Sequence, residues 1–369
     1  MKNRLKKLLL EFQFIKGLIK LKIFFYTQLN YIKMRYNKLI GNQEIPDILN
    51  NINIEISSKC NLGCKFCGYP KRNLNDHPHT TMSDLDFESN VKQCETLGYE
   101  NIGLSPVSGD IFMDKNIYNK FEILENSKIN GYYFYSNFIP IQKNLIDQLF
   151  LFKKLNFIGI SIYGHDLESF KKITDSNQVS YFRLIENLKY LYESLLKLRN
   201  NFVISIDQRD SIDFNINQDN SELSKIIKLI LNLDYPNIKY EFETNYNNWG
   251  GMIEHEDIKD LNIQLNKPNH KKVGSCSLLF SRLIIGANNT VNACACRDAN
   301  YTLKIGNTRT ESLKNILSIK NKTYLDIINK HEKEMYPPIC KDCDFYTSIY
   351  GSKHAMGLDA ENKPKIKIK

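Results

Sequence analysis

The sequence lacks any hydrophobic run long enough to cross a membrane. The longest uncharged stretch near its start, Ile23–Ile32, is about half the length that a spanning helix needs. No secretory signal and no internal repeat can be recognised. We therefore expect a protein of the reducing cytoplasm, where clustered cysteines favour metal binding over disulfide bonds.

Outside its first 41 residues, the chain also lacks an excess of either charge. Residues 1–41 contain ten Lys or Arg and one acidic residue, whereas the remaining 328 contain 40 of each sign. This distribution argues against a nucleic-acid binder. The basic segment 1–45 carries apolar residues at helical spacing. This spacing predicts one or two helices that pack on the body or on a partner, or that lie on an anionic membrane surface.

Six strand-like segments alternate with amphipathic, helix-like segments from residue 51 onward. The predicted strands are Ile52–Ser57, Asn101–Pro106, Tyr132–Ser136, Phe157–Ile162, Phe202–Asp207 and Ile238–Glu243. The predicted helices between them include Asn116–Lys128, Leu145–Lys154, Phe182–Leu198 and Glu222–Leu233. Such a series of β–α units predicts a parallel sheet with helices on the outside. Periodicity does not decide whether the sheet closes into a barrel.

Three of the nine cysteines directly follow the first predicted strand. Cys60, Cys64 and Cys67 have the spacing C-x3-C-x2-C, which can wrap three corners of an iron–sulfur cubane. The next cysteine, Cys94, falls in a helix-like run and is expected to be a small buried residue. A zinc site would need a fourth ligand, for which His77 and His79 are the nearby candidates. The spacing favours a [4Fe-4S] cluster with one open iron.

The other five cysteines form a second group, spaced C-x17-C-x-C and then C-x2-C. Four of them are enough to close a complete [4Fe-4S] cluster or a zinc site. We expect the ligands to be Cys276, Cys294, Cys340 and Cys343. Cys296 is then the spare thiol, and it could exchange with Cys294.

The first cysteine motif, with Phe66 directly before the last cysteine, resembles the signature of the radical S-adenosylmethionine (SAM) superfamily. The resemblance implies an incomplete (β/α)6 barrel related to the TIM barrel. It also implies that the amino and carboxylate groups of SAM chelate the open iron. An electron from the cluster, delivered by a flavodoxin- or ferredoxin-type donor, then yields a 5′-deoxyadenosyl radical that abstracts hydrogen from a substrate.

The same resemblance implies SAM contacts at the carboxyl ends of the strands. The expected SAM-binding residues are Phe66, Gly109, Asp110, Ser136, Asn137, Ser161 and Arg209. Asp110 stands where the family often has Glu, and Tyr163 stands where Asp is common. Arg209 suits the SAM carboxylate, because a guanidinium group pairs with a carboxylate through two hydrogen bonds.

The second cysteine region resembles the SPASM domain and its shorter form, the twitch domain, which carry auxiliary clusters. The segment Asn288–Cys294 resembles the hairpin before the second cysteine, with Asn289 in the place of Gly. Five cysteines are too few for two cubanes, so we expect one auxiliary [4Fe-4S] cluster in a small α+β domain. The expected division is a helical segment 1–45, a radical SAM core 48–252, a linker 253–275, the auxiliary domain 276–347 and a basic tail 348–369.

The function expected from this resemblance is oxidation of a small molecule of the sugar or aminocyclitol kind. The alternative within the same class is modification of a peptide or protein. A non-catalytic zinc-binding adaptor is the alternative from another class.

Overall fold

The computed structural model describes residues 2–45, 51–199, 202–233, 235, 237–266, 271–318 and 320–351, with side chains from residue 17 onward. Most of the expected tail, residues 352–369, lies outside the described residues. So do residues 267–270 of the expected linker and residues 46–50 at the expected start of the core.

The core of the molecule is a curved sheet whose first six strands are all parallel. These strands are β1 (Asn51–Ile54), β2 (Asn101–Gly103), β3 (Gly131–Ser136), β4 (Leu155–Tyr163), β5 (Val203–Arg209) and β6 (Ile238–Glu243). They pair in chain order, and β6 does not return to pair with β1. The predicted incomplete (β/α)6 barrel is therefore confirmed.

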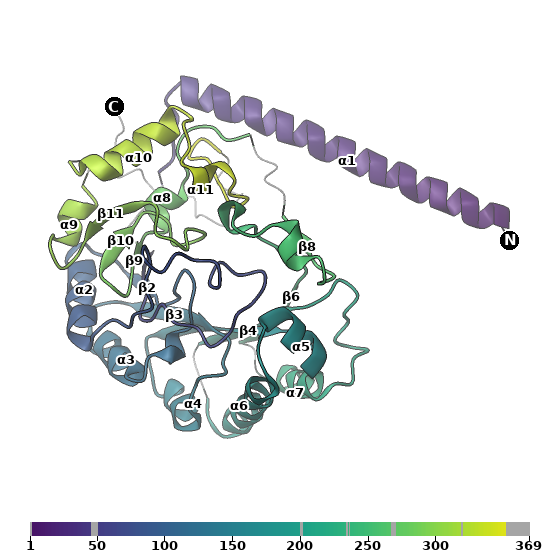
Figure 1. Ribbon diagram of the computed structural model, residues 1–369, viewed down its shortest axis with the longest axis horizontal. Helices are drawn as coiled ribbons and strands as arrows, with labels where there is room; N and C mark the ends of the chain where they lie inside the picture. The colour runs from purple at the N-terminus through teal and green to yellow at the C-terminus, as the bar shows by residue number, and fades with distance from the viewer. Residues whose placement is uncertain are drawn as a thin grey trace.

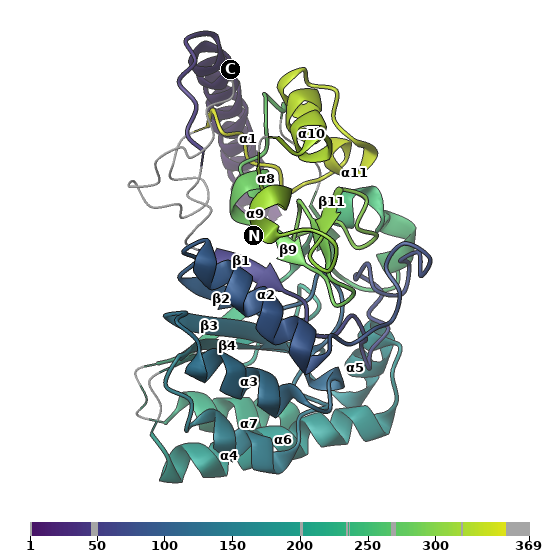
Figure 2. The same ribbon diagram turned by 90° about the vertical axis from the view of Figure 1, so that its left-hand side faces the viewer.

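Helices cover the outer face of this sheet (Figures 1 and 2). They are α2 (Asp84–Thr96), α3 (Ile117–Asn126), α4 (Lys143–Leu149), α5 (Leu167–Thr174), α6 (Gln178–Lys197) and α7 (Glu222–Leu231). Short polar side chains cap the N-termini of α2, α5, α6 and α7. Ser83 accepts a hydrogen bond from the Asp86 amide at the start of α2, and Asp166 accepts one from the Ser169 amide at the start of α5. Cys94 is fully buried on α2.

Side-chain alternation along the strands separates the core from the inner face of the sheet. On β3, the rings of Tyr132 and Phe134 stack on Phe121 of α3, with centroids 5.6 and 5.7 Å apart. Because successive strand residues point to opposite faces, Tyr133 and Tyr135 face the inner side. Tyr135 is 42% exposed there, so the inner side of the sheet is accessible.

The C-terminal part extends the same sheet instead of forming a separate one. Its elements are α8 (Leu278–Ser281), β9 (Ile284–Ile285), β10 (Thr290–Asn292), β11 (Lys304–Asn307), α9 (Leu313–Ile316), α10 (Lys322–Glu332) and α11 (Pro338–Lys341). Strand β9 pairs in parallel with β1, and β10 and β11 follow in antiparallel order. Asn289 has a φ of 67° in the turn before β10, a conformation that Asn tolerates well.

Helix α8 occupies Leu278–Ser281, and the strand β9 begins at Ile284. The linker expected at residues 253–275 includes regular structure. The expected linker contains η3 (His255–Ile258) and β8 (Gln264–Leu265), which pairs with β7 (Asn245–Tyr246). A further short helix, η2 (Trp249–Gly251), precedes it, and η1 (Ile111–Met113) follows β2.

The N-terminal segment is one long helix, α1 (Lys2–Leu39), which extends away from the body (Figure 1). Its last turns contact the C-terminal part. The Arg35 guanidinium donates to both carboxylate oxygens of Glu334 at 2.6 and 2.7 Å, and Met34 is buried. Within the part of the chain that the structure describes, no helix is both long and apolar enough to span a bilayer.

Candidate functional site: two cysteine sites on one sheet

The first three cysteines lie on the loop that leaves the carboxyl end of β1. The tip of α5 holds this loop, since the Gly63 amide donates to the Thr174 carbonyl at 2.9 Å. The Cys67 amide donates to the Cys64 carbonyl at 2.9 Å, which folds the last two cysteines into one turn. The Cys67 Sγ in turn accepts a hydrogen bond from the Tyr69 amide at 3.4 Å. None of the three thiols is in a disulfide bond.

Burial raises the pKa of all three thiols, and it raises that of Cys67 to about 11. The positive charges of Arg209, Arg72 and Arg297 oppose this rise at Cys67. A buried thiol becomes a thiolate only when a cation or a metal stabilises the negative charge. A loop with one buried and two half-buried thiols and with arginines nearby therefore fits an iron–sulfur cluster.

Gly109 and Asp110 lie beside the cysteine loop, after β2. Gly109 has a φ of 155°, and a Cβ atom there would lie 2.9 Å from the Ser57 carbonyl oxygen and 3.0 Å from that of Lys59. Only glycine leaves room for the loop at this position. Asp110 is buried, and its backbone amide donates to the Lys59 carbonyl at 2.7 Å.

Asp110 joins the cysteine loop to β3, since its backbone amide contacts Lys59 of the loop and its carboxylate contacts the end of β3. It accepts hydrogen bonds from the Asn137 amide at 2.7 Å and from the Ser136 hydroxyl at 2.9 and 3.1 Å. Burial raises the pKa of Asp110 to about 6, although these donors and the Phe112 amide lower it. Because protein donors occupy both oxygens, the geometry favours a role for Asp110 in positioning the loop.

Asn137 continues this network to the first cysteine. Its Nδ2 donates to Asn61 Oδ1 at 2.8 Å and lies 4.0 Å from Cys60 Sγ. Ser136, Asn137 and Asp110 are thus brought together with Cys60 at one edge of the sheet.

Two further expected SAM-binding residues lie on adjacent strands, and one of them has a free donor. Ser161 on β4 is paired in register with Asp207 of β5, and Arg209 ends β5 opposite Tyr163. Arg209 Nη1 is buried and has no hydrogen-bond partner among the described residues. An unpartnered buried guanidinium nitrogen is costly, and a bound carboxylate would satisfy it. This observation fits the carboxylate of SAM.

Three aromatic rings enclose the cysteine loop next to Arg209. The Phe66 ring centroid lies 5.4 Å from that of Tyr163 and 4.6 Å from that of Tyr246. The sequence did not indicate Tyr246, because it lies in the two-residue strand β7, outside the six predicted units. These rings exclude water from the side of the loop that faces them.

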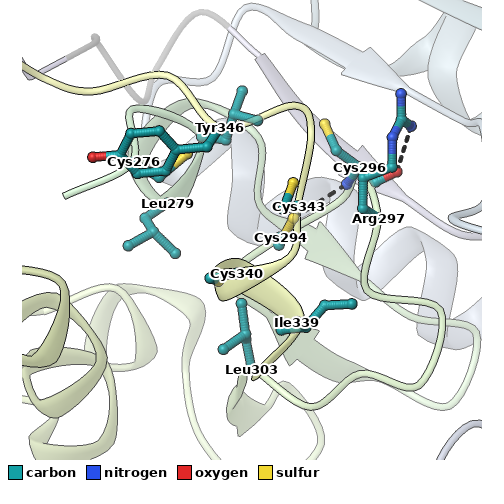
Figure 3. A pocket seen from close by; sticks show the side chains of 11 residues that line it. Cys276, Leu279, Cys294, Cys296, Arg297, Leu303, Ile339, Cys340, Cys343 and Tyr346 are labelled. Carbon is teal, nitrogen blue, oxygen red and sulfur yellow. Dashed lines mark hydrogen bonds between the residues drawn. The ribbon is translucent and has the colours of Figure 1, made fainter. Parts of the chain in front are cut away.

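The second group of cysteines lines a single small cavity (Figure 3). All five thiols contribute, and none is in a disulfide bond; they are Cys276, Cys294, Cys296, Cys340 and Cys343. The rest of the cavity lining is mainly apolar, with Leu278, Leu279, Leu303 and Ile339. Thiols gathered in an apolar shell fit a closed iron–sulfur cluster.

Backbone amides donate to sulfur at this second site as they do at the first. The Cys296 amide donates to Cys294 Sγ at 3.5 Å, and the Phe345 amide donates to Cys343 Sγ at 3.3 Å. Each donor is two residues after its cysteine, as Tyr69 is after Cys67. Within the described residues, no three His, Cys, Asp or Glu side chains are arranged to hold a single metal ion. A cubane does not need that arrangement, because it places each thiolate on a separate iron.

Arg297 lies between the two cysteine sites and was not among the expected residues. Its Cζ atom lies 4.6 Å from the ring centroid of Phe345 and 5.8 Å from that of Trp249. Burial raises the thiol pKa of both Cys67 and Cys343, and the positive charge of Arg297 opposes that rise at each. In the sequence, Arg297 is one charged residue after a cysteine, and only the fold places it beside both sites.

The structure thus combines an open parallel sheet, a three-cysteine loop at its carboxyl edge and a second cysteine-rich domain, which is what the resemblance to radical SAM enzymes with a SPASM domain implies. Residues 276–344 match the SPASM family, described as an iron–sulfur cluster-binding domain. The C-terminal part of the chain is therefore a SPASM domain. No curated protein sequence matches the chain.

Solved structures share most of this architecture at low sequence identity. A crystal structure of BtrN in complex with AdoMet and 2-DOIA superposes with a TM-score of 0.51 at 13% identity, covering 81% of this chain and 94% of BtrN. Streptococcus suis SuiB bound to the precursor peptide SuiA superposes with a TM-score of 0.54 at 15% identity, covering 88% of this chain and 77% of SuiB. These similarities establish the fold.

Proposed function

We propose that the protein is a radical SAM enzyme with two [4Fe-4S] clusters, one held by Cys60, Cys64 and Cys67 and one held by the SPASM domain. The observation that carries the proposal is the placement of three free thiols on the loop after β1, with the unpartnered Nη1 of Arg209 close by. When bound, SAM and the first cluster supply a 5′-deoxyadenosyl radical that abstracts a hydrogen atom from the substrate.

The residues of the chain would bind and shield these groups. Arg209 would pair with the SAM carboxylate, and Gly109 would allow the backbone to approach the ligand closely. Asp110 would hold the cysteine loop against β3 through Ser136 and Asn137. The rings of Phe66, Tyr163 and Tyr246 would keep water away from the cluster and the radical.

The substrate that we propose is a hydroxyl-bearing small molecule that loses two electrons. One would leave with the abstracted hydrogen atom, and the auxiliary cluster would accept the other. Two observations support this class. The chain covers 94% of BtrN, whose structure contains 2-DOIA, and 77% of SuiB, whose structure contains a peptide. The inner face of the sheet also presents polar side chains, including the exposed Tyr135 and the nearby Asp207. A flavodoxin- or ferredoxin-type donor would reduce the first cluster.

Metal analysis of anaerobically purified protein tests the cofactors. We expect about eight irons and eight sulfides per chain, because each cubane contains four of each. Zinc without iron would instead indicate a non-catalytic zinc-binding adaptor. Replacing Cys60, Cys64 and Cys67 together with Ala should leave about four irons and abolish 5′-deoxyadenosine formation from SAM. Cys94→Ala is the matched control, since Cys94 is buried on α2, away from both sites.

Isotope transfer tests the substrate. Candidate sugars and aminocyclitols carrying deuterium on carbon should transfer it to 5′-deoxyadenosine, as detected by mass spectrometry. Transfer from a labelled peptide, and from none of the small molecules, would favour peptide modification instead.

We also propose that α1 binds an anionic membrane surface. Leu18, Leu21, Phe25, Leu29 and Ile32 are between 50% and 65% exposed on the side opposite the buried Met34. Other sides of the helix also present exposed apolar side chains, namely Ile19, Ile23 and Phe24, so an extended apolar surface surrounds this part of α1. The ten basic residues among the first 41 complement anionic lipids and oppose self-association of the helix.

Vesicle sedimentation tests this contact with the intact protein. Binding should occur to phosphatidylserine-containing vesicles, should be weak to phosphatidylcholine vesicles, and should be lost in the Phe25→Glu, Leu29→Glu double variant. A dimer in solution that the same variant disrupts, without vesicle binding, would overturn the membrane assignment.

A further inference from the structure

The side chain of Lys272 contacts the loop that contains the last two cysteines. Its Nζ donates to the carbonyl oxygens of Lys341 at 2.7 Å and Cys343 at 3.0 Å, and also to that of Cys340. The Nζ lies 5.5 Å from the centroid of the Tyr346 ring, another residue lining the cavity of five cysteines. A single ammonium group thus contacts three backbone carbonyls of the C-x2-C loop.

The backbone around Lys272 is fixed to the same site from the other side. The Tyr346 hydroxyl donates to the carbonyl oxygens of Val273 and Gly274 at 2.8 and 2.7 Å. The first cysteine of the second group, Cys276, lies two residues after Gly274. Lys272 therefore connects the segment that supplies Cys276 with the loop that supplies Cys340 and Cys343.

No carboxylate lies within ion-pairing distance of Lys272 among the described residues, although other lysines near this domain have such partners. Lys38, for example, lies 3.4 Å from Glu334. The positive charge of Lys272 is thus directed at the cysteine loop without a direct ion-pair partner, and Asp342 of the same loop interacts with it only at longer range. Reduction of a cluster adds a negative charge, and a nearby cation stabilises the reduced form.

We propose that Lys272 is a positioning residue whose charge raises the reduction potential of the auxiliary cluster. This inference rests on the auxiliary cluster in the proposed function. A higher potential would favour transfer of an electron from the substrate to this cluster. The residue would act on the potential of the second cluster and leave that of the first unchanged.

The experiment is a redox titration of the holoenzyme followed by EPR, in three variants. Lys272→Gln removes the charge but can still donate to carbonyls, and we expect the auxiliary cluster to become about tenfold harder to reduce, about 59 mV for one electron. Lys272→Arg keeps the charge and should keep the potential. Lys271→Gln is the matched control, because Lys271 reaches Gln28 of α1 at 3.0 Å and not the cysteine loop.

Iron content separates the outcomes. A Gln variant with full iron and an unchanged potential would overturn the proposal. A second outcome would also overturn it. In that case the Gln variant loses iron, the Arg variant keeps all of it, and any remaining EPR signal of the auxiliary cluster shows no shift in potential. The lysine would then only hold the loop. If the unmodified protein contained only about four irons, the proposal of an auxiliary cluster would itself be contradicted, and this inference would fall with it.

Discussion

His77 and Glu55 form a buried pair where the barrel meets the SPASM domain. His77 Nε2 lies 2.7 Å from Glu55 Oε1, and both side chains are almost fully buried. The second ring nitrogen, Nδ1, lies 2.9 Å from the carbonyl oxygen of Ala299, and the Ala287 amide donates to Glu55 at 3.3 Å. Glu55, directly after β1, and His77, in the loop after the first cysteines, thus both contact the C-terminal domain.

Glu55→Ala should therefore weaken the junction between the two domains. The variant removes the partner of a buried imidazole and of a buried amide, which we expect to lower the free energy of unfolding by about 2–3 kcal/mol. Urea denaturation under anaerobic conditions measures this change. Glu88→Ala is the control, because Glu88 forms an exposed pair with Lys92 on α2 and should cost about 0.5 kcal/mol or less. Equal effects of the two variants would contradict the role of the buried pair.

The sequence predicts the parts of this fold that depend on local patterns. All six predicted strands are present, because each follows from a hydrophobic run, but β1 ends at Ile54 and β2 at Gly103, three residues before their predicted ends. The polar residues Ser136 and Asn137 at the end of β3 are also visible in the sequence. The three-cysteine loop is recognisable because its ligands lie within eight residues. The hairpin around Asn289 is also a local signal, since it requires a residue that tolerates a positive φ.

The contacts between distant segments could not be predicted in this way. Strand β9 joins the sheet beside β1, pairing Asn53 with Ile284 across more than 200 residues, and no local pattern specifies that partner. Lys272 resembles any surface lysine in the sequence, and His77 resembled a spare metal ligand. Their roles depend on carbonyl and carboxylate groups that only the folded chain brings near them.

A second contact between the domains should depend on pH. Arg309 Nη2 lies 2.7 Å from Asp86 Oδ2, and this guanidinium lowers the pKa of Asp86 to about 2. Because the folded-state pKa is below the unfolded value of about 3.9, the pair stabilises the protein above about pH 4 and loses this contribution as the pH falls toward 2. Arg309 is more than half exposed, so the contribution should be at most about 1 kcal/mol.

Urea midpoints of the unmodified protein and the Arg309→Met variant, at pH 7, 5 and 3, measure this contribution. The difference should be constant between pH 7 and 5 and smaller at pH 3. Acid would release cluster sulfide from both proteins alike. The difference between their urea midpoints therefore reports the contribution of the Arg309–Asp86 pair. A difference that grew on acidification would contradict the assignment.

The choice between Cys294 and Cys296 as a cluster ligand can be tested by iron content. Cys294 Sγ accepts a hydrogen bond from an amide two residues later, as Cys67 and Cys343 do, and Cys296 has no such donor among the described residues. We expect Cys294→Ala to retain about four of eight irons and Cys296→Ala to retain all of them. The opposite result would make Cys296 the ligand.

Arg209→Lys should weaken SAM binding about tenfold. The buried Nη1 of Arg209 has no partner among the described residues, and a lysine cannot reproduce the planar pair of donors that a carboxylate accepts. Loss of one charge-assisted hydrogen bond costs about 1.5 kcal/mol, which is about a factor of ten in affinity. Titration of the reduced holoenzyme with SAM, followed by the change in its EPR spectrum, gives the dissociation constant. Arg183→Lys, an exposed position on α6, should leave it unchanged. If Arg209→Lys lowered the stability but not the affinity, Arg209 would be a structural residue of the barrel mouth.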